Sequence, residues 1–116
     1  MDHMKNHWDQ EMILIRKTVS EPEGIQFTSH VVLERMAERD ISLIDIGFTF
    51  LTGRIYEGYD CGQYPRYRNP DPFRTVCGKS SKGELITVGI AFKSNGIIAV
   101  TTCYKGVPER LKQLFE

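Results

Sequence analysis

A histidine and two arginines lie close together near residue 30, in a segment with the spacing of a short helix. Ser29 has the chemistry of an N-cap, so the sequence predicts a helix that begins at His30, where free backbone N–H groups and the positive end of the helix dipole favour an anion. Arg35 and Arg39 follow one helical turn apart. Imidazole carries a proton near neutral pH, and guanidinium groups bind phosphate. This segment therefore predicts groups that handle a proton and a phosphate.

The expected helix separates its apolar and charged side chains. Its apolar stripe consists of Val32, Leu33, Met36 and Ala37. At about 100° per residue, His30 borders this stripe, whereas Arg35 and Arg39 fall on the far polar side. One common site for all three therefore requires strands or a loop that close around the start of the helix. The alternative is a capped surface helix whose arginines pair with Glu34 and Glu38.

The segment from Gly62 to Arg74 interleaves three arginines with three aromatic residues and three prolines. Arginine makes bidentate contacts with phosphate, tyrosine offers a stacking surface for bases, and proline keeps the segment extended. The residues expected to contact RNA are Arg66, Tyr67, Arg68 and Arg74. The alternative is a polar hairpin loop whose aromatic side chains cover an edge of the core.

Metal-free cleavage of RNA needs a base for the 2′-hydroxyl, an acid for the leaving 5′-oxygen, and cations that offset the charge on the phosphate. The candidate catalytic residues are His30, Arg35, Arg39, Thr101 and Tyr104, and Glu57 is an additional candidate for the base. Thr101 would bond the substrate or hold His30, and a structural threonine is the alternative. There is no glycine-rich phosphate loop and no HExxH or Asp-x-Asp motif, so neither a metal nor a cofactor is expected.

The charges are balanced overall but unevenly distributed. The chain has 116 residues with 15 basic and 15 acidic side chains, and 41% of it is hydrophobic, which suits one compact domain. Residues 1–59 carry six basic against ten acidic side chains, a net charge of −4, whereas residues 60–105 carry seven against three, a net charge of +4. A basic face that attracts RNA is compatible with this pattern.

Cysteine spacing and hydropathy indicate in which compartment of the cell the protein is located. The three cysteines are far apart in sequence, so partly buried free thiols are expected rather than a disulfide framework or a zinc site. No apolar run approaches the ~20 residues of a membrane span. The sequence thus favours a cytoplasmic protein with no membrane partner.

Residues 1–24 are predicted to form an N-terminal arm, and residues 25–116 a single α+β domain. In the arm, Trp8, Met12 and Ile15 recur at helical spacing, although residues 12–15 fit an edge strand equally well. Such an apolar stripe needs a surface to cover, on its own domain or on a second copy of the chain, and we expect a homodimer contact there.

The domain is expected to start with two helices and continue with strands. The second helix is capped by Ser42 and Asp45 and ends at Gly53, and its apolar stripe consists of Leu43, Ile46, Phe50 and Leu51. Strands are predicted from Arg54 and over Phe73–Gly78, Glu84–Phe92 and Gly96–Tyr104. The expected fold class is α+β, with two N-terminal helices packed on one antiparallel sheet of about four strands and a short C-terminal helix from Val107.

The residues from Phe27 to Tyr104 resemble the DUF4258 family, a domain of unknown function. That family typically reads S-H-A-x-x-R-M-x-E-R-G-I at the first helix, and here Val31 replaces the alanine and Asp40 the glycine. The resemblance implies a helix pair that leads into strands, with a late strand that carries Thr101 and Tyr104.

In element order the family is similar to small ribonuclease toxins of the RelE and barnase kind. This likeness implies a toxin-type protein that binds RNA, cleaves it without a metal, and has a cognate antitoxin. The rival hypothesis is a non-catalytic interaction module that binds a protein partner through its acidic arm and an exposed strand edge. Convergence of His30, Arg35 and the 66–74 loop on one cleft would favour the enzyme.

Overall fold

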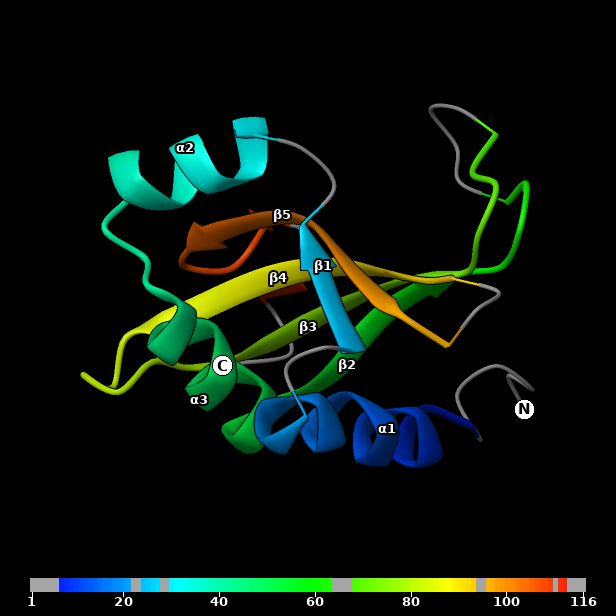
Figure 1. Cartoon of the computed structure of the whole chain (residues 1–116), viewed down its shortest axis with the longest axis horizontal. Coiled ribbons are helices and arrows are strands. Elements are labelled where there is room, and N and C mark those ends of the chain that lie inside the picture. Colours follow the sequence, from blue (N-terminus) through cyan, green and yellow to red (C-terminus); the bar gives the residue numbers. More distant parts are fainter. Residues whose placement is uncertain are drawn as a thin grey trace.

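Five strands form one mixed sheet, and three helices cover one of its faces (Figure 1). The computed structural model describes residues 7–21, 24–27, 30–63, 68–93, 96–109 and 111–112, and gives only the backbone of His30 and Val31. A single core cluster joins all three helices to the sheet. The residues at its centre are Ile15, Phe50, Val76, Val88, Ile90 and Val100, each 0% exposed. Within the described part of the chain, no helix has the length and apolarity required to cross a membrane.

The strand order is β1-β5-β4-β3-β2. The strands are β1 (Ile25–Phe27), β2 (Arg54–Tyr59), β3 (Phe73–Lys79), β4 (Leu85–Phe92) and β5 (Ile98–Lys105). The four predicted strands are present as an antiparallel meander, β2 to β5. The expectation of a purely antiparallel sheet was wrong, because β1 pairs in parallel with β5, with Ile25 opposite Ile98. A three-residue strand is too short to show a period in sequence, and its partner lies far along the chain.

The N-terminal segment forms α1 (Trp8–Ser20), which packs against α3 and β2. Met12 and Ile15 are buried in the core of their own chain. The stripe predicted to make a homodimer contact is therefore already covered by the chain's own fold. Glu11 strengthens this packing, because its two carboxylate oxygens accept hydrogen bonds from Arg74 of β3 at 2.8 and 3.1 Å.

The second helix, α2 (His30–Glu38), ends in a left-handed turn at Asp40, whose φ is 55°. The backbone N–H of Ile41 donates to the carbonyl of Met36 at 2.8 Å, and that of Asp40 donates to Ala37 at 3.2 Å. This pair of bonds is the Schellman motif, with buried Ile41 and Met36 as its apolar contact. Asp40, where the family pattern has glycine, therefore still forms this turn. Its left-handed backbone conformation costs free energy that a glycine would not lose.

The third helix, α3 (Leu43–Thr52), has the predicted ends. Ser42 and Asp45 form a reciprocal capping box, and Gly53 follows the last turn. A side chain at Gly53 would collide with the carbonyl oxygen of Cys77, which explains the glycine at this close approach to β3. The predicted apolar stripe was partly wrong, since Leu43 and Leu51 are 62% and 51% exposed.

Two polar residues lie on the buried face of α3. Asp45 and Thr49 are buried there together with Ile46 and Phe50. Their polar atoms have hydrogen-bond partners, because the Asp45 carboxylate accepts from the Ser42 N–H at the helix cap and from the Ser81 hydroxyl at 3.2 Å, and the Thr49 hydroxyl donates to the Asp45 carbonyl at 2.7 Å. A hydroxyl or carboxylate that has such partners can be buried at little cost.

The chain after β5 differs from the predicted C-terminal helix. Among its described residues, 111–112 adopt 3₁₀ geometry, and none is α-helical. Leu111 is buried, and the carbonyl of Gly106 accepts a hydrogen bond from the hydroxyl of Thr87 at 2.7 Å. A short turn is sufficient to bring one apolar side chain back onto the domain.

Candidate functional site

A hollow of about 200 Å³ lies where α2 crosses β5. Its lining consists of Val32, Arg35, Arg39, Thr101, Thr102 and Cys103. Three of the predicted site residues, Arg35, Arg39 and Thr101, therefore lie together. The prediction that Arg39 falls on the far polar side of α2 was wrong, and Arg35 also lines the hollow although it is exposed.

The buried face of α2 is rotated relative to the predicted stripe. Val32 and Met36 are 6% and 4% exposed, whereas Leu33 is 45% exposed and Ala37 is also exposed. This rotation turns the arginine side of the helix towards β5. The hollow exists because α2 packs on the sheet through Val32 and Met36. Helical periodicity alone does not determine which of its faces packs.

Arg39 is fixed in the hollow by a hydrogen bond from its Nη1 to the backbone carbonyl of Cys103. Arg35 is exposed. No acidic side chain lines the hollow, and neither arginine forms an ion pair within the described residues. The predicted alternative, pairing with Glu34 and Glu38, is therefore not realised in the structure. Two guanidinium groups in one hollow can bind the oxygens of a phosphate.

The strand side of the hollow is shaped by an irregularity in pairing. Gly89 of β4 lies opposite Thr102, but the next residue, Ile90, lies opposite Val100, so Thr101 is an extra residue in β5. The Thr101 hydroxyl donates to the carbonyl of Gly89 at 3.1 Å. This bond occupies the hydroxyl hydrogen and leaves the oxygen as an acceptor. Thr102 is exposed beside it and offers a second hydroxyl.

Cys103 forms the buried end of the hollow. Burial raises the pKa of its thiol, and the positive charge of Arg39 opposes that shift. The thiol is therefore protonated at neutral pH and is a poor nucleophile. Cys77 is buried as well, whereas Cys61 is exposed, contrary to the expectation of a partly buried thiol at each position.

The other predicted catalytic residues are less closely defined. The backbone of His30 begins α2, as predicted, but its side chain lies outside the described part of the structure. Tyr104 follows Cys103 on β5 and is half-buried. Glu57 of β2 accepts a hydrogen bond from the hydroxyl of Thr75 at 3.1 Å. Because β2 and β5 are at different places in the sheet order, Glu57 is not part of the hollow.

The predicted RNA-binding loop does not converge on this hollow through its described residues. Arg66 and Tyr67 lie outside the described residues, and Arg68 is exposed. Arg74 is 4% exposed, and its guanidinium is held by Glu11 and by the carbonyls of Tyr59 and Phe73. Arg74 therefore anchors α1 to β3, whereas α2 lies over β5. Arg74 and the hollow are therefore parts of different contacts in the fold.

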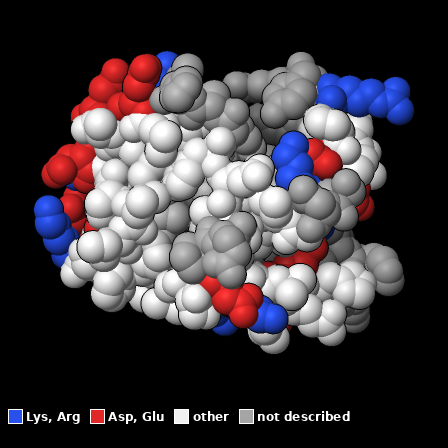
Figure 2. All heavy atoms as spheres, viewed as in Figure 1, with Lys and Arg blue, Asp and Glu red and all other residues white. Residues whose placement is uncertain are grey.

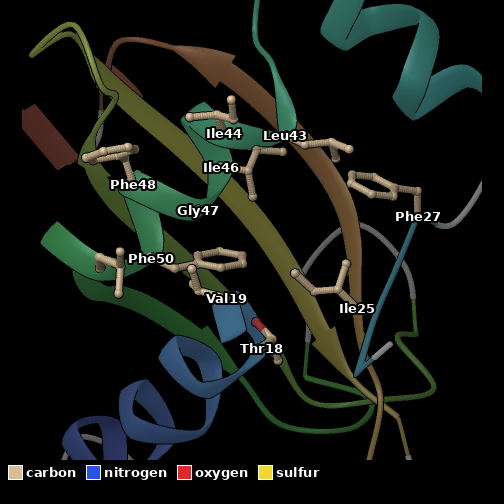
Figure 3. Close-up of a pocket in the computed structure, with 11 residues that line it drawn as sticks. Thr18, Val19, Ile25, Phe27, Leu43, Ile44, Ile46, Gly47, Phe48 and Phe50 are labelled. Atoms are coloured by element: carbon tan, nitrogen blue, oxygen red, sulfur yellow. The ribbon is translucent and has the colours of Figure 1, made fainter. Parts of the chain in front are cut away.

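A larger cavity of about 520 Å³, which no sequence motif predicted, lies between α3, β1 and the end of α1 (Figure 3). In Figure 3, Ile25 and Phe27 of β1 lie across from Leu43 and Ile46 of α3, with Val19 and Thr18 at one end. A clue was present in the sequence, since Asp45 is the only charged residue of α3. A helix that is apolar almost all round has more apolar surface than one sheet can cover.

Comparison with known proteins gives one match. A family model described as "Domain of unknown function (DUF4258)" matches residues 27–105, from the end of β1 to the end of β5. No curated protein and no solved structure matches the chain. The likeness to RelE and barnase toxins stays a prediction.

Proposed function

The chain belongs to the DUF4258 family, and from that premise we propose that it is a toxin-type cytoplasmic protein that binds RNA at the hollow between α2 and β5. One observation carries the proposal: Arg35 and Arg39 lie in the same hollow as the hydroxyls of Thr101 and Thr102, and none of the lining residues that the structure describes is acidic. Two guanidinium groups supply charge, and two hydroxyls supply hydrogen-bonding groups for one phosphate.

The two arginines have different roles in this proposal. Arg39 is held by Cys103 and so presents its remaining N–H groups in a fixed direction, which reduces the entropy lost on binding. Arg35 is exposed and supplies an adjustable second contact. The basic segment that includes exposed Arg68 would contact the RNA backbone further along, outside the hollow.

Cleavage of the bound RNA is the second part of the proposal. In a metal-free reaction the 2′-oxygen attacks the neighbouring phosphorus, a base takes the 2′ proton, and an acid gives a proton to the departing 5′-oxygen. His30 is the proposed proton carrier, because it begins the helix that carries Arg35 and Arg39. The arginines would offset the extra negative charge on the phosphate as the new bond forms.

Binding is tested by a salt titration with a fluorescent single-stranded RNA. Arg35→Ala removes an exposed cation, and Lys82→Ala, which removes an exposed cation from the β3–β4 turn, is the matched control. We expect Arg35→Ala to weaken binding several-fold and to lower the slope of log K against log salt by about 0.7, while the control changes neither. Equal effects of the two variants would refute a site at the hollow.

The alternative function, a non-catalytic protein-interaction module, is favoured by a different observation. Large apolar side chains are exposed on α1 and α3, among them Leu14, Ile44 and Leu51 at 56%, 66% and 51%. A wild-type chain that binds no RNA at low salt would favour this alternative, with a protein partner such as an antitoxin.

A further inference from the structure

The outward face of α3 carries four of the eight exposed large hydrophobic side chains among the residues that the structure describes. Its residues are Leu43, Ile44, Gly47, Phe48 and Leu51, and we call them the α3 face. Its four large side chains are 42–66% exposed. At 100° per residue the five positions fall within one arc of about 140°, and the opposite arc consists of the buried residues Asp45, Ile46, Thr49 and Phe50. The α3 face is therefore a single continuous stripe.

This stripe has both a ridge and a notch. Ile44 and Phe48 stand four residues apart and form a ridge, whereas the neighbouring row of Leu43, Gly47 and Leu51 is interrupted at its middle by a glycine. A Cβ at Gly47 would make only an ordinary contact with Val19, at 3.7 Å. Packing within the chain thus does not require a glycine there. Because Gly47 has no side chain, the outer surface of α3 has a notch at this position.

The surroundings of the α3 face are also apolar. The cavity of about 520 Å³ continues from the helix to β1, where Ile25 and Phe27 form its far wall (Figure 3). Figure 2 shows that uncharged surface covers this part of the molecule, with charged side chains gathered towards its edges. The only charged residue of α3, Asp45, is buried and faces away from the stripe.

We propose that the α3 face binds the α3 face of a second copy of this chain around a twofold axis. A twofold contact requires one surface to be complementary to itself, and the stripe supplies both the ridge and the notch that receives it. Packing of i±4 rows into each other crosses two helices at about −50°, with closest approach at the small residue. Gly47 would lie near the axis, and no like charges from α3 would meet there.

The available area is consistent with a dimer of weak to moderate affinity. The exposed side chains of the α3 face and Val19 offer on the order of 500 Å² of apolar surface, and the half-buried walls of the cavity add to it, against ~800 Å² per partner in a standard interface. The same surface is poorly suited to a small molecule, because a ligand site needs polar groups that fix orientation. Among the described lining residues, Thr18 contributes the side-chain hydroxyl. That hydroxyl already donates a hydrogen bond to the carbonyl of Ile15 at 2.6 Å.

The test is sedimentation of the full chain over a range of concentrations. We expect wild type to dimerise by about 100 µM, a weak to moderate affinity. Ile44→Glu and Phe48→Glu should be monomeric, because two buried charges would face each other across the axis. Leu33→Glu is the matched control, since Leu33 is a 45% exposed apolar residue on α2, away from the α3 face. It should dimerise as wild type does.

A second variant separates dimerisation from folding. Gly47→Ala improves helix propensity, so the melting temperature of the monomer should rise, yet it fills the notch and should weaken the dimer ~10-fold. A monomeric wild type at the highest concentration overturns the proposal and indicates a different partner for this face. A dimer that survives both glutamate variants also overturns it, because the contact then lies elsewhere. RNA binding by the monomeric variants is measured in parallel, so that failure of this proposal is distinct from failure of the proposed function.

Discussion

Glu11 of α1 and Arg74 of β3 form a two-point ion pair, with the guanidinium donating at 2.8 and 3.1 Å to the two carboxylate oxygens. Arg74 also lies over the ring of Phe92, 5.9 Å from its centre, and Asp60 is 3.7 Å from its Nη2. An arginine predicted to bind RNA is thus part of the contact that holds the N-terminal helix on the sheet.

Loss of Glu11 should therefore destabilise the fold. Glu11→Ala leaves a buried guanidinium without its main partner, and we expect the free energy of unfolding to fall by about 3 kcal/mol. Glu34→Ala, at an exposed position on α2, should change it by less than about 0.5 kcal/mol. Urea denaturation of both variants measures the difference, and equal values would show that the ion pair contributes nothing to stability.

Asp40 should gain stability on replacement by glycine. Its φ of 55° lies in the left-handed region, where glycine has no steric penalty. We expect Asp40→Gly to raise the free energy of unfolding by about 0.5–1 kcal/mol, with Asp40→Ala lowering it. Thermal unfolding of the pair checks the opposite signs. A stabilising alanine would contradict the assigned role of this turn.

Asp45 should make stability depend on pH in the acid range. The backbone hydrogen bond from Ser42 lowers the pKa of the Asp45 carboxyl below 3.8, despite the opposing effect of burial. Its stabilising contribution is present above the pKa of the unfolded chain and is lost as pH falls through the lower folded pKa. We expect Asp45→Asn to cost about 1 kcal/mol at pH 7 and less at pH 2. A pH-independent difference in urea unfolding would argue against this assignment.

Cys103 should be the protected thiol and Cys61 the reactive one. Burial raises the pKa of the Cys103 thiol, and Cys61 is exposed. A thiol reagent at pH 8 should modify Cys61 first, followed by Cys103 and Cys77 only on unfolding. The raised pKa also means that the contribution of Cys103 to stability is present below the pKa of the unfolded thiol and is lost as pH rises through the folded value. Mass spectrometry of the modified peptides distinguishes the order, which Cys61→Ser should confirm.

His30→Ala should abolish any RNA cleavage without loss of the fold. Removal of a general base or acid typically reduces the rate by about 10²–10⁴-fold. A capping or packing histidine would instead lower the melting temperature and leave activity intact. Cleavage and thermal unfolding measured on one preparation separate these outcomes. Full activity with a lowered melting temperature would make His30 structural, and the proton transfer would then belong to another residue.

Local chemistry in the sequence determined the ends of several elements. Ser42, Asp45 and Gly53 predicted both ends of α3. The family resemblance was confirmed over nearly the same residues as predicted. Such features depend on groups within a few residues of one another, so the sequence carries them directly.

Only the tertiary structure decided which faces of these elements are used. Helical periodicity placed Arg39 away from the sheet and Leu51 in the core, but docking on β5 and β3 brought Arg39 to the carbonyl of Cys103 and left Leu51 exposed. Likewise, β1 is a strand because β5 supplies its partner, and Arg74 is buried because α1 supplies Glu11. For Arg39, β1 and Arg74 the deciding group lies more than 60 residues away in sequence, and its contact exists only once the whole domain has packed.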